Sequence, residues 1–187
     1  MSNHFDIINT PLSSLKIINR KPIHDHRGYF ERLFCNEAFQ KLILGKPIRQ
    51  VNHTLTSNRG TVRGMHFQYP PYTETKLISC IRGEVFDVAV DLRKNSPTFL
   101  KYHAEILSEE NHKIFFIPEG FAHGFQTLSE NCELLYFHTN VYDPQSEGII
   151  NAIDSKISIS WPFPVMNRSE RDSSCPMLDS NFQGVTL

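Results

Sequence analysis

Short strand-like segments, each ended by turn residues, run through most of the 187-residue chain. The 14 Phe and 11 Pro residues strengthen this pattern, because large aromatic side chains favour strands and proline favours turns. Many short strands with few helices predict an all-β sandwich or barrel, and a double-sheet jelly roll of about eight strands fits this length. The expected strands are Leu15–Arg20, Tyr29–Phe34, Ile48–Thr56, Thr61–Gln68, Thr75–Arg82, Glu84–Asp91, Lys101–Leu107, Lys113–Ile117, Ala122–Leu128 and Cys132–Asn140.

One segment predicts a short helix. Asn36 is a suitable N-cap, Gly45 and Pro47 end the segment, and its apolar stripe consists of Ala38, Phe39, Leu42 and Ile43. After Trp161-Pro162-Phe163-Pro164 the strand pattern becomes irregular, but apolar residues such as Met177 and Leu178 remain. We therefore expect a single domain over residues 1–187, with the C-terminal segment from about residue 162 packing on the barrel.

Charge and apolar patterning exclude several classes of protein. Lys and Arg total 19 against 20 Asp and Glu, and this balance argues against a nucleic-acid-binding protein. No apolar run approaches the roughly 20 residues that span a bilayer, and the N-terminus lacks the basic and apolar regions of a secretory signal. The four cysteines, Cys35, Cys80, Cys132 and Cys175, are far apart, which is typical of free thiols in a reducing compartment. We expect a cytoplasmic protein that binds neither nucleic acid nor membrane.

The segment Glu84–Asp91 alternates in a way that bears on function. Phe86, Val88 and Val90 share one face, whereas the opposite face carries Val85, Asp87, Ala89 and Asp91. A strand with carboxylates on its second face either meets water or lines a cavity.

Three stretches place ionisable groups beside glycines, where the backbone can approach a ligand closely. In Arg63-Gly64-Met65-His66-Phe67-Gln68, strand alternation puts His66 and Gln68 on one face, and a bulge at Gly64 could bring Arg63 round to join them. In Ile117–Phe125, His123 stands near the start of a strand. In Tyr136–Tyr142, the two terminal tyrosines are an even number of residues apart and can face the same way.

Each of these residues also has an ordinary structural interpretation. Any one of the nine histidines, His138 included, is more often a core or surface residue than a catalyst. Tyr136 can be a core aromatic, Lys76 a surface lysine and Asp172 the cap of a turn. Residue types and spacing alone therefore indicate a β-barrel with a possible histidine site.

Several motifs occur together in one order: Asp25-x-Arg27-Gly28-x-Phe30, Gln50-x-Asn52, Arg63-Gly64-Met65-His66-Phe67-Gln68, Lys76-Leu77-Ile78, Arg82–Arg93, Ser96-Pro97-Thr98, Ile117–Phe125, Trp161-Pro162 and Ser169-x-Arg171-Asp172. In this order they resemble the RmlC family of cupins, the dTDP-4-dehydrorhamnose 3,5-epimerases of nucleotide-sugar biosynthesis. The resemblance runs from about Asp25 to Leu178.

The resemblance implies a cupin jelly-roll barrel with one or a few short helices, a homodimer built by exchange of N-terminal strands, and a reaction without cofactor or metal. The implied reaction is epimerisation of dTDP-4-dehydro-6-deoxy-D-glucose at C3 and C5 to dTDP-4-dehydro-L-rhamnose, through an enolate. By position, His66 matches the catalytic base, Asp172 the carboxylate that pairs with it, and Tyr136 the general acid on the opposite face of the sugar. Lys76 and His123 match the groups around the 4-keto oxygen.

The remaining matches concern substrate binding. Arg27, Arg63, Glu147 and Arg171 match residues that hold the nucleotide-sugar, and Arg27 is the residue that reaches the neighbouring subunit's site. The nucleotide-end contacts match Gln50 and Asn52, and the ring that stacks on the base matches Tyr142. The sequence departs from the family at Arg32, where a glutamate usually stands, and this leaves nucleotide specificity open.

Three alternatives remain. The chain can be a single-centre 3- or 5-epimerase of a related nucleotide-4-keto-sugar. It can be a metal-dependent cupin that uses His66 and His123, although such cupins usually carry two histidines two positions apart, and Gln68 stands in the second position here. It can be an inactive binding module, but such a protein is expected to lose His66, Tyr136 or Asp172, and all three are present.

Overall fold

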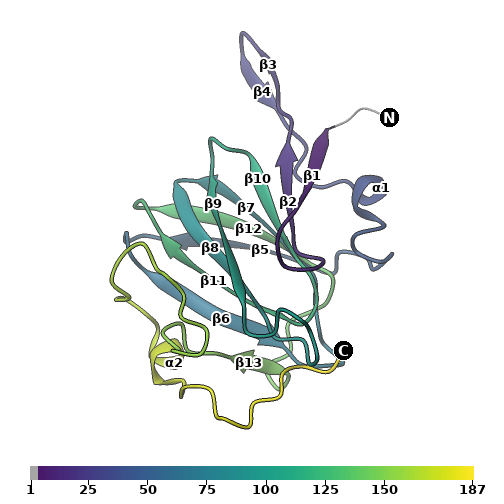
Figure 1. Ribbon diagram of the computed structural model, residues 1–187. Helices are drawn as coiled ribbons and strands as arrows, with labels where there is room; N and C mark the ends of the chain where they lie inside the picture. Colours follow the sequence, from purple (N-terminus) through teal and green to yellow (C-terminus); the bar gives the residue numbers. More distant parts are fainter. Residues whose placement is uncertain (1–3) are drawn as a thin grey trace.

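Two antiparallel sheets face each other in the computed structural model, which describes residues 4–187 and so leaves out the first three residues of the N-terminal stretch (Figure 1). The six-stranded sheet has the order β1 (Phe5–Asn9), β2 (Lys16–Arg20), β10 (Lys113–Ile117), β7 (Lys76–Arg82), β12 (Cys132–His138) and β5 (Gln50–Thr56). The five-stranded sheet has the order β13 (Glu147–Ile149), β6 (Val62–Gln68), β11 (Phe121–Thr127), β8 (Glu84–Asp91) and β9 (Tyr102–Ser108). The predicted all-β jelly roll is confirmed.

The remaining elements are small. A two-stranded hairpin, β3 (Ile23–Asp25) and β4 (Gly28–Phe30), projects away from the two sheets (Figure 1). The two helices are α1 (Asn36–Phe39) and α2 (Glu170–Ser174). None of the helices in the described part of the chain is long and apolar enough to cross a membrane.

Most of the expected strands form within two residues of their predicted bounds. The exception is the segment Tyr29–Phe34. The strand found there, β4, covers Gly28–Phe30 and ends four residues earlier than predicted. Beyond Phe30 the chain turns back towards the six-stranded sheet, because Glu31 pairs with the buried Arg20 at 2.7 Å and the Phe34 ring stacks on Phe137. The short strands β1, β3 and β13 and the helix α2 were not predicted, because three to five residues carry too little periodicity to be seen in the sequence.

The predicted helix begins one residue earlier than expected. Cys35, not Asn36, occupies the N-cap, and it makes no side-chain capping bond. The regular helix ends at Phe39, although the Ile43 N–H still donates to the Phe39 carbonyl at 2.9 Å. Of the apolar stripe, only Phe39 and Ile43 are fully buried, and they pack on the outer face of the six-stranded sheet.

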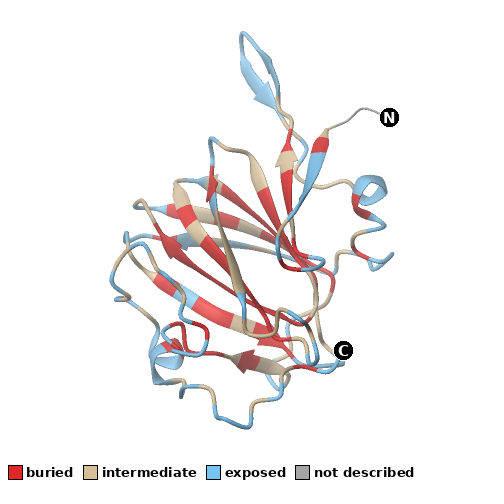
Figure 2. Ribbon diagram, viewed as in Figure 1, coloured by how far each residue is buried: buried red, intermediate tan, exposed pale blue. Residues whose placement is uncertain are grey.

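The core has three layers, and buried residues line both faces of the five-stranded sheet (Figure 2). Between the sheets lies a cluster that includes Val85 and Ala89 of β8. On the outer face of the five-stranded sheet, Val88 and Val90 pack against residues of the C-terminal segment, among them Val165, Leu178, Phe182 and Val185. The alternation predicted for Glu84–Asp91 is therefore confirmed, and it places Asp87 on the face that looks into the barrel.

The predicted bulge at Gly64 is also confirmed. His123 pairs with His66 and Phe125 pairs with Arg63, so β6 holds one residue more than β11 between these pairs. Gly64 has a φ of +112°, and a Cβ atom there would lie 2.6 Å from the Cα of Gly124. The two strands can approach this closely only because both positions are glycine, and the bulge brings Arg63 to the same cavity as His66.

The bulge yields a stability prediction with a matched control. Gly60 also has a positive φ (+82°), but no atom lies within 4 Å of the position of its Cβ. Gly60→Ala should therefore cost only the conformational strain, about 1–2 kcal/mol. Gly64→Ala adds the clash with backbone and should cost a further 1–3 kcal/mol or so. Urea denaturation of both variants measures the difference, and equal stabilities would show that β6 and β11 are not packed as described.

Candidate active site

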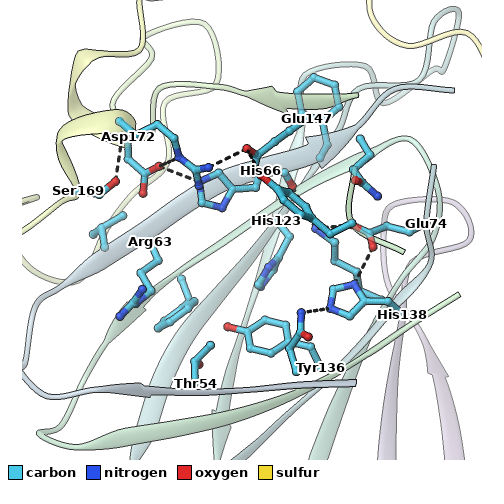
Figure 3. A pocket seen from close by; sticks show the side chains of 18 of the residues that line it. Thr54, Arg63, His66, Glu74, His123, Tyr136, His138, Glu147, Ser169 and Asp172 are labelled. Atoms are coloured by element: carbon cyan, nitrogen blue, oxygen red, sulfur yellow. Dashed lines mark hydrogen bonds and ion pairs between the residues drawn. The ribbon is translucent and has the colours of Figure 1, made fainter. Parts of the chain in front are cut away.

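A cavity of about 740 Å³ opens between the two sheets at the end of the barrel where β6, β7 and β12 meet the C-terminal segment (Figure 3). Every site residue predicted from the sequence except Arg27 lines it: Gln50, Asn52, Arg63, His66, Lys76, His123, Tyr136, Tyr142, Glu147, Arg171 and Asp172. The five-stranded sheet carries His66 and His123, and the opposite sheet carries Lys76 and Tyr136. A ligand in the cavity therefore meets different groups on its two faces.

Arg27 lies outside this cavity. It stands in the turn of the β3–β4 hairpin, where its side chain is 78% exposed and pairs with Asp25 at 2.6 Å. The hairpin that carries Arg27 extends away from the two sheets (Figure 1).

His66 is held by the C-terminal segment. Its Nε2 atom lies 2.7 Å from Oδ1 of Asp172, and the second carboxylate oxygen accepts a bond from the Gly64 N–H at 3.2 Å. Ser169 caps α2 by accepting the Asp172 N–H at 3.1 Å, which fixes the start of the helix that presents the carboxylate. Burial alone raises the pKa of Asp172, but the bonds from His66 and Gly64 outweigh it and hold this pKa below its ordinary value. Asp172 is therefore an anion, and Nδ1 of His66 carries the lone pair.

Arg171 lies beside this pair. Its Nη1 atom bonds to Oε2 of Glu147 at 2.7 Å, and its Nη2 atom lies 3.2 Å from Nε2 of His66. Because that nitrogen already donates to Asp172, the second contact is a close approach of two donors and not a hydrogen bond. The Tyr142 hydroxyl donates to the same Glu147 oxygen at 3.1 Å. Glu147 thus joins Arg171 and Tyr142 at the rim of the cavity.

His123 is paired with a buried carboxylate. Its Nε2 atom lies 2.8 Å from Oδ1 of Asp87, and the other Asp87 oxygen has no hydrogen-bond partner among residues 4–187. Burial lowers the pKa of His123 and raises that of Asp87, so both groups are driven towards the uncharged form. In such a neutral pair the Asp87 hydroxyl donates to Nε2, and the proton of the imidazole is on Nδ1.

Tyr136 faces this pair from the opposite sheet. Its ring centroid lies 6.0 Å from that of His123, with the planes inclined at 70°. Burial raises the pKa of Tyr136 above its ordinary value. The phenol is therefore protonated at neutral pH and can donate a proton.

Lys76 is buried at the start of β7. Its ammonium group donates to the His66 carbonyl at 3.3 Å and lies 3.3 Å from Oε1 of Glu74. An ammonium group has three donors, so one N–H is left for a ligand.

Arg63 differs from the other two cationic side chains of the cavity. Its Nε atom donates to the hydroxyl of Thr56 at 2.9 Å. Lys76 and Arg171 both pair with carboxylates, whereas Arg63 forms no ion pair within the described part of the chain. Its charge is therefore available to an anionic ligand.

Two titratable residues that line the cavity, Glu74 and His138, received no site role in the sequence analysis. Glu74 pairs with Lys76, and His138 donates from Nδ1 to Oε2 of Glu74 at 2.7 Å. Strand parity carried a signal for both, because Glu74 is two residues before Lys76 and His138 is two residues after Tyr136. The signal was weak, since a histidine beside a core tyrosine usually has a structural role.

No group of three or more His, Cys, Asp and Glu side chains between residues 4 and 187 is arranged to hold a metal ion. That the reaction requires no metal stays a prediction from the sequence. His66 and His123, the pair considered for a metal cupin, each pair with a different carboxylate.

Comparisons with known proteins agree with this geometry. The profile of the family described as dTDP-4-dehydrorhamnose 3,5-epimerase matches residues 9–180. The dTDP-4-dehydrorhamnose 3,5-epimerase of Salmonella typhimurium is 44% identical over 176 residues, which are 92% of this chain and 95% of that protein. The epimerase of Methanothermobacter thermautotrophicus is 42% identical over 180 residues, 95% of this chain and 96% of that protein.

A solved structure is also similar to this chain over nearly its whole length. The crystal structure of the RmlC epimerase from Legionella pneumophila, in complex with dTDP-4-keto-L-rhamnose, superposes with a TM-score of 0.90 at 38% identity. The match covers 97% of this chain and 98% of that one. With the family profile and the relatives, this shows that the chain belongs to the dTDP-4-dehydrorhamnose 3,5-epimerase family of cupin-type isomerases.

Proposed function

We propose that this protein epimerises dTDP-4-dehydro-6-deoxy-D-glucose at C3 and C5, giving dTDP-4-dehydro-L-rhamnose for deoxysugar biosynthesis. The observation that carries the proposal is the placement of His66, paired with Asp172, and Tyr136 on opposite sheets of one cavity. Inversion of a carbon centre needs a proton removed from one face and another delivered to the opposite face. The family membership of the chain supports the same reaction.

His66 acts as the base. The 4-keto group makes the protons on C3 and C5 acidic, because the resulting carbanion is delocalised onto the ketone oxygen. The bond from Nε2 to Asp172 fixes the tautomer that leaves Nδ1 free to accept a proton, and the carboxylate stabilises the imidazolium that forms. Such a base typically contributes about 10²–10⁴-fold to the rate.

Lys76 and His123 stabilise the enolate. The one ammonium N–H of Lys76 that is not bonded within the chain can donate to the oxygen. The neutral pair formed by His123 and Asp87 presents a second donor at Nδ1 of His123. Removal of one such preorganised donor costs on the order of 3–4 kcal/mol of transition-state stabilisation in other enzymes.

Tyr136 returns the proton from the opposite face. Its raised pKa keeps the phenol protonated until the strongly basic enolate carbon takes the proton. The nearby charges do not ionise it, since burial is the largest influence on the group. After each inversion His66 gives the abstracted proton to solvent and Tyr136 takes a proton from solvent, so both groups return to their starting states.

The rim of the cavity holds the nucleotide. Arg63 is the cation available to the diphosphate, since guanidinium pairs with two phosphate oxygens at once. Gln50 and Asn52 of β5 and the half-exposed Tyr142 contact the nucleoside, and Arg171 and Glu147 contact the sugar diphosphate. Gln68 supports this arrangement, because its amide bonds to the Tyr72 and Val141 carbonyls and to the Asp143 N–H, and so fixes the loop that carries Tyr142.

The functional unit in this proposal is a homodimer, and Arg27 completes the partner's site. The hairpin that carries Arg27 exposes the apolar side chains of Ile23, Tyr29 and Phe30. Edge strand β5 exposes Val51 and Leu55 on its outward face. An apolar hairpin and an apolar strand edge left uncovered in a single chain support association of two copies by exchange of this N-terminal region.

Two variants separate the proton-handling groups. His66→Asn removes the base, so deuterium exchange from solvent and epimerisation should fall together, by about 100-fold or more. Tyr136→Phe deletes only a hydroxyl, so His66 can still remove and return a proton on its own face. Exchange should then persist while inversion at one or both carbons fails. NMR of the substrate recovered from deuterated buffer measures both quantities.

The outcomes that contradict these roles are distinct. Inversion of both centres at the wild-type rate by Tyr136→Phe would make Tyr136 a core aromatic. Normal exchange by His66→Asn would exclude His66 as the base. Thermal denaturation of each variant provides the control for folding.

Hybrid dimers test the role of Arg27. Subunits with Arg27→Ala and subunits with His66→Asn should each form weakly active homodimers. In a hybrid of the two, one site has an intact His66 and receives Arg27 from the partner, so co-expression with different affinity tags should restore activity to one of the two sites. Hybrids no more active than the two parents, or an active monomer in light scattering, would contradict the shared site.

A further inference from the structure

Glu74 and His138 form a buried pair to which the reaction described above gives no role. Both residues line the cavity, and only 8% of the His138 surface is exposed. Oε1 of Glu74 lies 3.3 Å from the Lys76 ammonium group, and Oε2 lies 2.7 Å from Nδ1 of His138. Burial acts to raise the pKa of Glu74, but Lys76 and His138 outweigh it and hold this pKa below its ordinary value. The pair therefore contains a carboxylate that accepts two hydrogen bonds.

The pair is one end of a continuous chain of hydrogen bonds. The Asn52 Nδ2 group lies 3.4 Å from Nε2 of His138, and Oδ1 of Asn52 accepts from Nε2 of Gln50 at 3.1 Å. Oε1 of Gln50 accepts from the Tyr142 N–H at 3.0 Å. The chain thus runs from Lys76, on the keto oxygen in the proposed reaction, to the loop that contacts the nucleoside. Figure 3 shows its bond between Glu74 and His138.

Each donor in this chain meets one acceptor only if His138 is neutral with its proton on Nδ1. The Tyr142 N–H then donates to Gln50, and the Gln50 amide donates to Asn52. The Asn52 amide donates to Nε2 of His138, whose Nδ1–H donates to Glu74. Protonation of His138 would place an N–H at Nε2, opposite the amide N–H of Asn52. The Asn52 amide would have to turn over, and its oxygen would then leave Gln50.

We propose that Glu74 and His138 are positioning residues, which hold Lys76 at one end of the substrate and Asn52 and Gln50 at the other through this single hydrogen-bond chain. The roles of the two ends rest on the proposed function. The chain itself rests only on the contacts within the protein. Because one network serves both ends, a substitution that breaks the bonds of His138 should change the environment of the Tyr142 backbone N–H.

Three variants test the proposal. His138→Gln keeps one hydrogen-bond acceptor and one donor, so it should preserve the chain. His138→Leu is apolar and breaks both links. Glu74→Gln has only one acceptor oxygen for the two donors, so it must release either Lys76 or His138.

The first measurement compares the Tyr142 backbone amide of the wild type, His138→Gln and His138→Leu by ¹⁵N NMR, without substrate. His138→Leu should shift the Tyr142 resonance and lower the protection of its N–H against solvent exchange, and His138→Gln should keep both close to the wild type. A Tyr142 amide that is unchanged in His138→Leu would overturn the proposal.

The second measurement compares steady-state constants. His138→Leu should raise KM about tenfold, the effect of one lost hydrogen bond between buried groups, with a smaller change in kcat, and His138→Gln should restore most of the KM. Glu74→Gln should lower kcat where it releases Lys76 and raise KM where it releases His138. Wild-type constants in either His138→Leu or Glu74→Gln would overturn the positioning role. An absence of turnover in the wild type would instead contradict only the proposed function, since the NMR comparison is independent of it.

Discussion

The Asp172 carboxylate ties the end of the chain to the bulge in β6, and the site depends on this contact. One oxygen accepts from His66 and the other from the backbone N–H of Gly64, so a single side chain fixes both the catalytic ring and the bulged backbone. The contact spans 106 residues of sequence, and it is held in place by the packing of the C-terminal segment on the outer face of the five-stranded sheet. Loss of that packing would release the partner of His66 and remove the part of the cavity wall that Arg171 and Asp172 form.

Charges in the cavity are arranged in local pairs. Glu74 offsets Lys76, Glu147 and Asp172 offset Arg171, and only Arg63 keeps an unpaired charge within the described residues. Pairing lets several ionised groups be buried together without the full cost of desolvation. It also fixes their positions before substrate arrives, which is the condition for strong stabilisation of a developing enolate.

Strand alternation carried most of what the sequence revealed about the fold. It gave the two faces of Glu84–Asp91 and the bulge at Gly64, and the turn residues between the long strands marked the bounds of nearly every one of them. It failed for Tyr29–Phe34, where tertiary contacts of Glu31 and Phe34 turn the chain. It also failed for α2, which is too short to show a helical period.

Single residues of the site could be predicted from the sequence, but the pairings between them could not. Glycine-flanked motifs and the resemblance to a known family led to His66, Tyr136 and Asp172, which the fold brings to one cavity. The pairings could not be seen, because His123 with Asp87 and His138 with Glu74 join strands that are distant in sequence. Arg27 was predicted at the site, yet within one chain it lies on an exposed hairpin, so its role requires a second copy.

Double epimerisation through an enolate is the central claim. The most direct measurement incubates the wild-type protein with dTDP-4-dehydro-6-deoxy-D-glucose in deuterated water and locates deuterium in the product by NMR and mass spectrometry. Deuterium at both C3 and C5, with both centres inverted, is the predicted result. Deuterium at one carbon alone would show a single-centre epimerase, and the absence of deuterium from both would contradict proton abstraction by His66.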